Sequence, residues 1–119
     1  MYAFPSASEL DFLIGREMET VCIGSWVLNF GFGQVSLDVE GAIEHVDQDG
    51  TVRKHNTDEA RRSPICLHHL LGQKVRTVDV EPFCLTLTFT RGDTLRVFSN
   101  EGPYECGQIY DEQGKVTVF

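Results

Sequence analysis

The chain of 119 residues has no long hydrophobic run and few positive charges. No segment approaches the run of about eighteen apolar residues that a membrane-spanning helix needs, so we expect no membrane segment. Its first ten residues lack the basic and apolar regions of a secretory signal, which indicates a cytoplasmic protein. Ten lysines and arginines face eighteen aspartates and glutamates, so the formal net charge is −8. This negative charge disfavours binding to nucleic acid or to anionic lipid.

The sequence also lacks the motifs of common enzyme classes. It contains no G-x-S-x-G turn for a nucleophilic serine, no H-E-x-x-H zinc motif and no glycine-rich loop for phosphates. A general acid and base pair among the eighteen carboxylates stays open. The sequence therefore favours a protein without enzymatic activity and leaves the enzyme as the alternative.

Cysteine is sparse, and the four cysteines are an even number. Without an export signal the cytoplasm keeps thiols reduced, so we expect no disulfide. The four residues expected as free thiols are Cys22, Cys66, Cys84 and Cys106.

One short segment contains several metal-ligand types. On a helix, Cys66 and His69 would share a face, with His68 beside them, and zinc accepts such a pair. Two ligands do not complete a site, and a third would have to come from His45 or His55. We therefore interpret the segment as an exposed helix face and predict no metal and no cofactor.

A second metal candidate resembles the start of a calcium loop. Residues Asp47 to Gly50 read D-x-D-G, but position 58 is Asp where the loop needs a bidentate Glu. A polar hairpin turn explains the segment, and it also explains the related turn from Asp111 to Gly114.

An internal repeat carries most of the information in the sequence. An offset of 57 gives eight identities over the 27 positions from Ser6 to Phe32, and the match resumes at larger offsets to the end of the chain. We interpret this as a tandem duplication with copies at about 6–55 and 63–119, folded as one domain, 1–119. The identities pair Ser6 with Ser63, Leu10 with Leu67, Leu13 with Leu70, Gly15 with Gly72, Thr20 with Thr77, Val21 with Val78, Leu28 with Leu85 and Phe32 with Phe89.

Each copy is expected to contain one short helix and about five antiparallel strands. Capping residues and helical spacing predict helices over about 8–14 and 64–71, each ended by a glycine. Alternating apolar residues predict strands such as 28–32 and 83–89, with β-bulges near Thr20 and Thr77. The predicted fold is α+β and β-dominated, and packs as a single pseudo-twofold sandwich or barrel.

The negative charge belongs to the first copy. Residues 1–50 contain nine acidic residues and one arginine, whereas residues 51–119 contain nine of each sign. Solubility is one explanation, and steering toward a basic protein partner is the other. We predict that an acidic set binds the partner: Glu17, Glu19, Asp38, Glu40 and Glu44. The outward positions Arg96 and Phe98 of the second copy are predicted to form any homodimer interface.

The second copy resembles a family of small bacterial β-rich proteins of unknown function. The resemblance rests on Leu-x-Gly-x-x-Val-x-x-Val at 70–78, Leu-x-Leu-x-Phe at 85–89 with Gly92, and Tyr-Glu-x-x-x-Ile at 104–109. Gly107 stands where the family usually has an aromatic residue. The family implies no activity, although similar small acidic proteins include immunity proteins that neutralise toxins.

The sequence thus favours a non-enzymatic protein-interaction domain, immunity-like in kind, that presents an acidic face to a basic partner. The alternatives are a small enzyme or ligand-binding protein with a site between the two copies, and a purely structural homo-oligomer.

Overall fold

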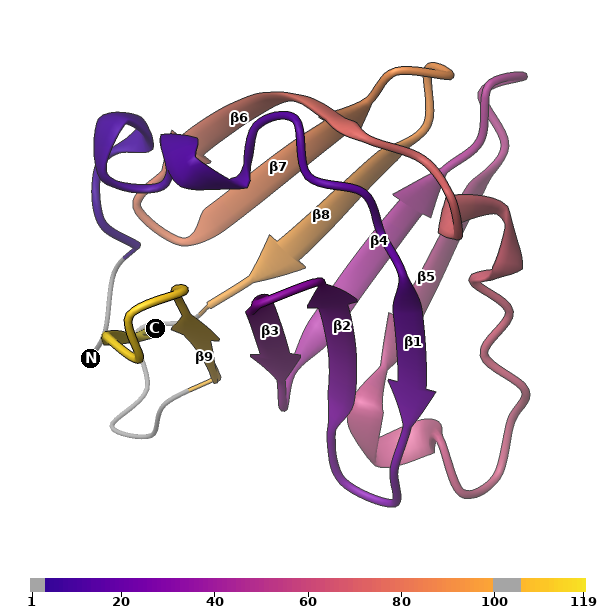
Figure 1. Ribbon diagram of the computed structural model, residues 1–119. Helices are drawn as coiled ribbons and strands as arrows, with labels where there is room; N and C mark the ends of the chain where they lie inside the picture. The colour runs from indigo at the N-terminus through magenta and orange to yellow at the C-terminus, as the bar shows by residue number, and fades with distance from the viewer. Residues whose placement is uncertain (1–3, 100–105) are drawn as a thin grey trace.

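The computed structural model describes residues 4–99 and 106–119, which form two five-stranded antiparallel sheets (Figure 1). The first sheet has the order β1 (Thr20–Ile23), β2 (Leu28–Phe32), β3 (Val35–Val39), β9 (Gly107–Tyr110) and β10 (Val116–Val118). The second has the order β6 (Val75–Glu81), β7 (Cys84–Phe89), β8 (Thr94–Phe98), β4 (Ala42–Val46) and β5 (Val52–Asn56). Both sheets are open, so the predicted β-dominated fold is confirmed and the barrel alternative is wrong.

Each sheet combines strands from both halves of the chain. Three consecutive strands of one half pair with the terminal hairpin of the other, through β3 with β9 and through β8 with β4. When β6 to β10 are matched to β1 to β5, the two sheets have the same strand order. Neither half therefore completes a five-stranded sheet by itself.

The two halves meet at a pair of reciprocal hydrogen bonds. The Gly15 amide donates to the Val75 carbonyl at 2.7 Å, and the Gly72 amide donates to the Met18 carbonyl at 2.9 Å. These residues are related by the offset of 57, and both glycines have the positive φ that favours glycine. The pattern of these two bonds is reciprocal, as a repeat would produce, while the duplication itself stays a prediction.

The two predicted α-helices are wrong. Residues 8–14 form the short 3₁₀ turns η1 (Ala7–Glu9) and η2 (Asp11–Leu13), and only η4 (His68–Leu70) occupies 64–71. The side chain of Ser6 at the N-cap of η1 makes no capping bond. An α-helix of two turns is marginal, and burial of leucines in the core determines the local path instead. A further turn, η3 (Thr57–Glu59), follows β5.

The strand alternation and the shared core are confirmed. Leu28, Phe30 and Phe32 are buried on β2, with intermediate residues between them. Leu13, Leu70, Phe32 and Phe89 belong to one hydrophobic core, as the repeat predicts. The predicted bulge is present in β6 between Val75 and Thr77, whereas β1 pairs with β2 without a shift from Thr20 onward. Within the described residues, no helix is long and apolar enough to cross a membrane.

The position of Gly107 leaves no room for a side chain. A Cβ at this position would overlap the Asp38 carbonyl oxygen and the Phe119 ring. We expect Gly107→Ala to lower the free energy of unfolding by about 1 to 3 kcal/mol, measured by urea denaturation. The control is Gly41→Ala, whose new Cβ would meet its nearest atoms at an ordinary 3.6 Å. Equal losses in the two variants would contradict this account of Gly107.

Candidate functional site

The acidic set predicted from the sequence does not form one cluster. Glu17 and Glu19 are exposed. Glu19 lies beside the β2–β3 turn, since its Oε2 atom would be 3.4 Å from a Cβ atom added to Gly33. Glu40 follows the opposite end of β3 and is also exposed. At roughly 3.4 Å per residue, β3 spans about 14 Å, so Glu40 and Glu19 lie toward opposite ends of this strand. They contribute a diffuse negative field to this side of the molecule.

Two further members of the acidic set have hydrogen-bond or ion-pair partners. Asp38 accepts a hydrogen bond from the Asn29 side-chain amide on the neighbouring strand β2. Glu44 lies on the second sheet, where its Oε1 atom is 2.9 Å from Arg96 NH1 and its side chain is only 11% exposed. The structure thus brings together Glu44 and Arg96, which the sequence analysis assigned to different surfaces.

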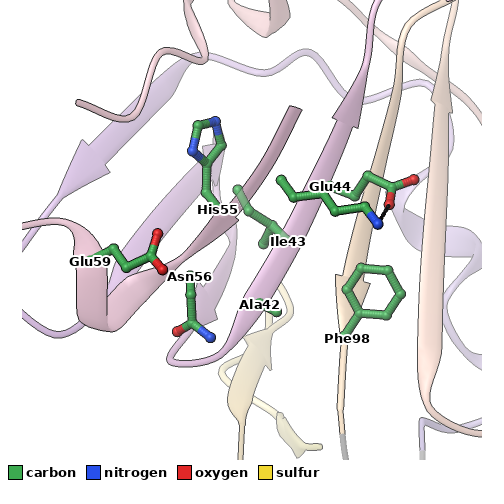
Figure 2. A pocket seen from close by; sticks show the side chains of 8 residues that line it. Ala42, Ile43, Glu44, His55, Asn56, Glu59 and Phe98 are labelled. Carbon is green, nitrogen blue, oxygen red and sulfur yellow. Dashed lines mark ion pairs between the residues drawn. The ribbon is translucent and has the colours of Figure 1, made fainter. Parts of the chain in front are cut away.

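A cavity on the second sheet, here called the outer cavity, lies beside this ion pair. Its volume is about 380 Å³, and its lining includes Glu44, Lys54, Asn56, Glu59 and Phe98. Figure 2 shows Phe98 and Glu44 on one side of the cavity, and Asn56 and Glu59 on the other. The predicted interface residue Phe98 therefore faces a cavity whose lining includes two carboxylates.

His55 also lines the outer cavity, and its ring is partly removed from solvent. Its Nε2 atom is buried without a hydrogen-bond partner among the described residues. Burial lowers the pKa of His55 below its ordinary value, and the nearby His45 lowers it further, while Glu59 opposes the shift.

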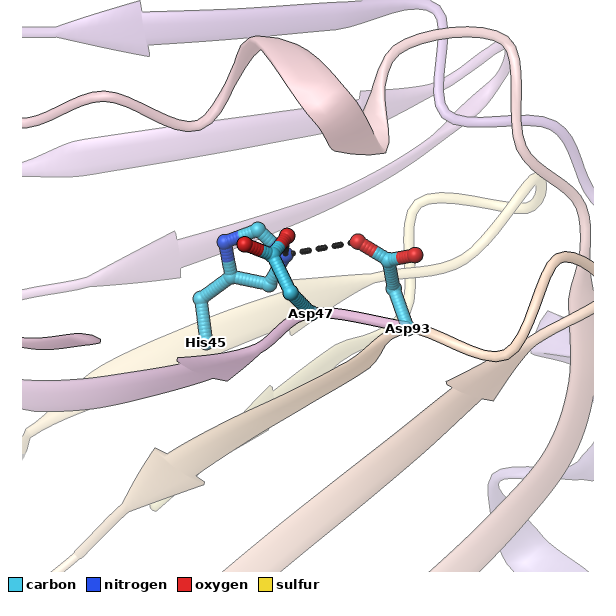
Figure 3. A group of neighbouring side chains, drawn as sticks. All are labelled: His45, Asp47 and Asp93. Atoms are coloured by element: carbon cyan, nitrogen blue, oxygen red, sulfur yellow. Dashed lines mark hydrogen bonds and ion pairs between the residues drawn. The ribbon is translucent and has the colours of Figure 1, made fainter. Parts of the chain in front are cut away.

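A second group of polar side chains, here called the inner cluster, lies inside the fold. It consists of His45, Asp47 and Asp93, whose candidate ligand atoms all lie within 4.8 Å of one another. His45 Nε2 is 2.8 Å from Asp93 Oδ2, and both side chains are 1% exposed. Figure 3 shows the His45 ring turned toward Asp93. Asp47 Oδ1 lies 3.7 Å from the same ring nitrogen.

Three elements position the inner cluster. His45 lies on β4 two residues after the buried Ile43 and shares its inward face. Asp93 ends the β7–β8 turn, where its carbonyl accepts from the Phe89 amide. Asp47 begins the β4–β5 hairpin, which is closed by the hydrogen bond from the Asp47 amide to the Thr51 carbonyl.

Two residues at the solvent side contact Asp47. Arg53 NH1 donates to Asp47 Oδ2, and this hydrogen bond raises the pKa of Arg53. His69 comes from η4 and places Nδ1 4.0 Å from Asp47 Oδ1. The two oxygens of Asp47 are thus divided between a guanidinium and two imidazoles.

The cysteine and histidine segment separates into two parts in the structure. Cys66 Sγ lies 3.4 Å from His68 Nδ1, while the adjacent His69 faces Asp47. Cys22, Cys66, Cys84 and Cys106 are free thiols. In the D-x-D-G turn, Asp49 Oδ1 accepts from the Thr51 amide at 2.9 Å, which lowers the pKa of Asp49 and fits the predicted hairpin turn.

Asp93 and the role of His45 were not predicted from the sequence. A signal for His45 was present, because a histidine in phase with the inward Ile43 must be buried and paired. Nothing in the local sequence indicated Asp93 as its partner, since 48 residues separate the two.

The chain shows no significant match to protein-family models, to curated proteins or to solved structures. The resemblance of the second copy to a bacterial family therefore stays a prediction.

The low pKa of His55 predicts a pH dependence of stability. The folded state binds fewer protons at His55 than the unfolded state, so the free energy of unfolding falls as the pH drops through the ordinary histidine pKa of 6.5. We expect His55→Gln to lose less stability than the wild type between about pH 7.5 and about pH 5.5, measured by urea denaturation. His68→Gln, which replaces an exposed histidine, should keep the wild-type slope. A His55→Gln slope equal to that of the wild type would contradict this assignment.

Proposed function

We propose that this protein is a non-enzymatic interaction domain that binds a basic protein partner and takes one of its cationic side chains into the outer cavity. The observation that carries the proposal is the combination of an aromatic ring, Phe98, with the carboxylates of Glu44 and Glu59 around one cavity of about 380 Å³. A net charge of −8 supports the same class of partner.

The chemistry of the cavity favours a guanidinium or an ammonium group. An aromatic face attracts a cation by about 0.5 to 1 kcal/mol at exposed sites. Glu59 makes no ion pair among the described residues, so its carboxylate is available, whereas Glu44 is shared by Arg96 and Lys54. We therefore assign the direct contact to Glu59 and Phe98, while Glu44 stays paired with Arg96 and Lys54 at the wall of the cavity.

The remaining acidic residues act at longer range. Glu17, Glu19, Asp38 and Glu40 are dispersed over a molecule 31 Å across, and the screening length at physiological salt is about 8 Å. Such charges accelerate encounter with a basic partner more than they strengthen the final complex.

A homodimer through Arg96 and Phe98 is the alternative use of the same face. Two chains of charge −8 repel each other, and Glu44 already pairs with Arg96. A foreign basic partner is therefore favoured over a second copy, and the oligomeric state stays open to measurement.

The cavity assignment is tested with a minimal cationic ligand. N-acetyl-arginine amide should shift the amide resonances of Ala42 and Asn56 in the ¹⁵N-labelled protein, whereas the neutral isostere N-acetyl-citrulline amide should not. Glu59→Gln should weaken the binding of the arginine ligand roughly two- to fivefold, the range expected for one exposed ion pair.

The control variant for this titration is Glu9→Gln, which removes an exposed acid from η1. It should bind the arginine ligand as the wild type does. Equal shifts with the citrulline ligand, or wild-type affinity in Glu59→Gln, would overturn the cavity assignment.

The long-range part of the proposal predicts a kinetic effect. Asp38→Lys with Glu40→Lys changes the net charge from −8 to −4. Association with a fluorescent deca-arginine peptide should become slower and less dependent on salt, measured by stopped flow, because the steering field is weaker. Sedimentation velocity should show an unchanged oligomeric state. Dissociation of an oligomer, or an unchanged rate and salt dependence, would contradict the assignment of the faces.

A further inference from the structure

Against the expectation of no metal from the sequence, we propose that the inner cluster, together with His69, is a binding site for one divalent transition-metal ion of the zinc class. The ligand atoms are His45 Nε2, Asp47 Oδ1, Asp93 Oδ2 and His69 Nδ1. This site uses none of the residues assigned to direct contact with a basic partner, so it stands or falls independently of the proposed function.

Three of the distances between the ligand atoms can be compared with those of a tetrahedral site, and His69 must move closer to complete it. Ligands about 2.0 to 2.1 Å from a tetrahedral zinc ion lie about 3.3 Å from one another. The distances from His45 Nε2 to Asp93 Oδ2 and to Asp47 Oδ1 are 2.8 Å and 3.7 Å, and Asp47 Oδ1 lies 4.0 Å from His69 Nδ1. The longest of these involves His69, whose side chain is 65% exposed on a short turn and is free to adjust.

The donor set selects the class of ion. Calcium and magnesium prefer oxygen ligands alone, whereas imidazole nitrogen suits zinc and its neighbours in the transition series. Two histidines and two carboxylates give a mixed set of nitrogen and oxygen donors, and the carboxylates of Asp47 and Asp93 balance the two positive charges of the ion.

Burial of unpartnered polar atoms gives independent support for a ligand. The His45 and Asp93 side chains are deeply buried, yet His45 Nδ1 and Asp93 Oδ1 have no hydrogen-bond partner among the described residues. Buried polar atoms of this kind need an explanation, because nearly all are paired in native proteins. A bidentate carboxylate would use the second oxygen of Asp93. Coordination through His45 Nε2 releases any proton held there to solvent and leaves the ring proton on Nδ1, which the ion does not contact. The support for a ligand therefore comes from Asp93 Oδ1.

The nearby cation Arg53 is compatible with this site. Its guanidinium binds Asp47 Oδ2, so the carboxylate is oriented with Oδ1 toward both histidines. Partners of this kind commonly orient metal ligands from the next layer of residues. The Arg53 side chain is 39% exposed, and solvent therefore screens its repulsion of a bound cation.

The ion has a route to the site from solvent. A second cavity, of about 280 Å³, is lined by Asp47, Gln48, Asp49 and His69. His69 and Asp47 thus lie at the mouth of the site, and His45 and Asp93 form its buried end.

The test is a zinc titration of the 119-residue chain after treatment with a chelator. Isothermal calorimetry with ZnCl₂ should give one ion per chain, and zinc should raise the melting temperature. In ¹⁵N spectra the ring nitrogens His45 Nε2 and His69 Nδ1 should shift on addition of zinc. His69→Gln and Asp47→Asn should each weaken zinc binding by at least about tenfold, the loss that even an outer-layer partner causes.

Matched controls come from the residues beside these ligands. His68→Gln replaces the neighbouring exposed histidine, and Asp49→Asn replaces the other aspartate of the same cavity. Both should bind zinc as the wild type does. The proposal is overturned if the wild type binds no zinc, or if His69→Gln and Asp47→Asn bind it normally. It is also overturned if binding is lost in His68→Gln and Cys66→Ser, because the ion would then sit at the Cys66 and His68 pair.

Discussion

The pairing of β4 with β8 is the interaction on which both candidate sites depend. It sets Glu44 opposite Arg96 and His45 opposite Leu95, residues from different halves of the chain. Because side chains alternate along a strand, one register places Glu44 on the outer face and His45 in the interior. A slip of one residue would exchange them and bury an acid in the core. The buried apolar residues of the two strands, Ile43, Leu95 and Val97, therefore fix the register. This register determines the positions of both candidate sites.

The exchange of hairpins explains why polar groups of the two halves meet. The β4–β5 hairpin leaves its own half and packs beside β8, which carries Asp47 to within reach of His69. The same exchange at the other sheet places β9 beside β3, where Gly107 leaves room for the Phe119 ring. The shared core then stabilises an arrangement that neither half could complete alone.

Local patterns in the sequence predicted the strands but not the contacts between halves. The alternation at Leu28, Phe30 and Phe32 is sufficient to define β2, since a buried face repeats every second residue. The two predicted helices were wrong because these short segments make no side-chain capping bond and form 3₁₀ turns with their leucines buried. The Glu44 and Arg96 pair and the His45 and Asp93 pair join residues 52 and 48 positions apart. Such pairs depend on which strands become neighbours in a sheet, and no local sequence motif indicates that arrangement.

The exchange of hairpins is tested most directly by interstrand nuclear Overhauser effects in the ¹³C,¹⁵N-labelled protein. The account predicts cross-strand contacts between the backbone protons of β4 and β8, at Glu44 with Arg96 and His45 with Leu95, and between β3 and β9 at Leu37 with Ile109. Contacts that instead join β4 to β3, as two consecutive strands within one half, would contradict it.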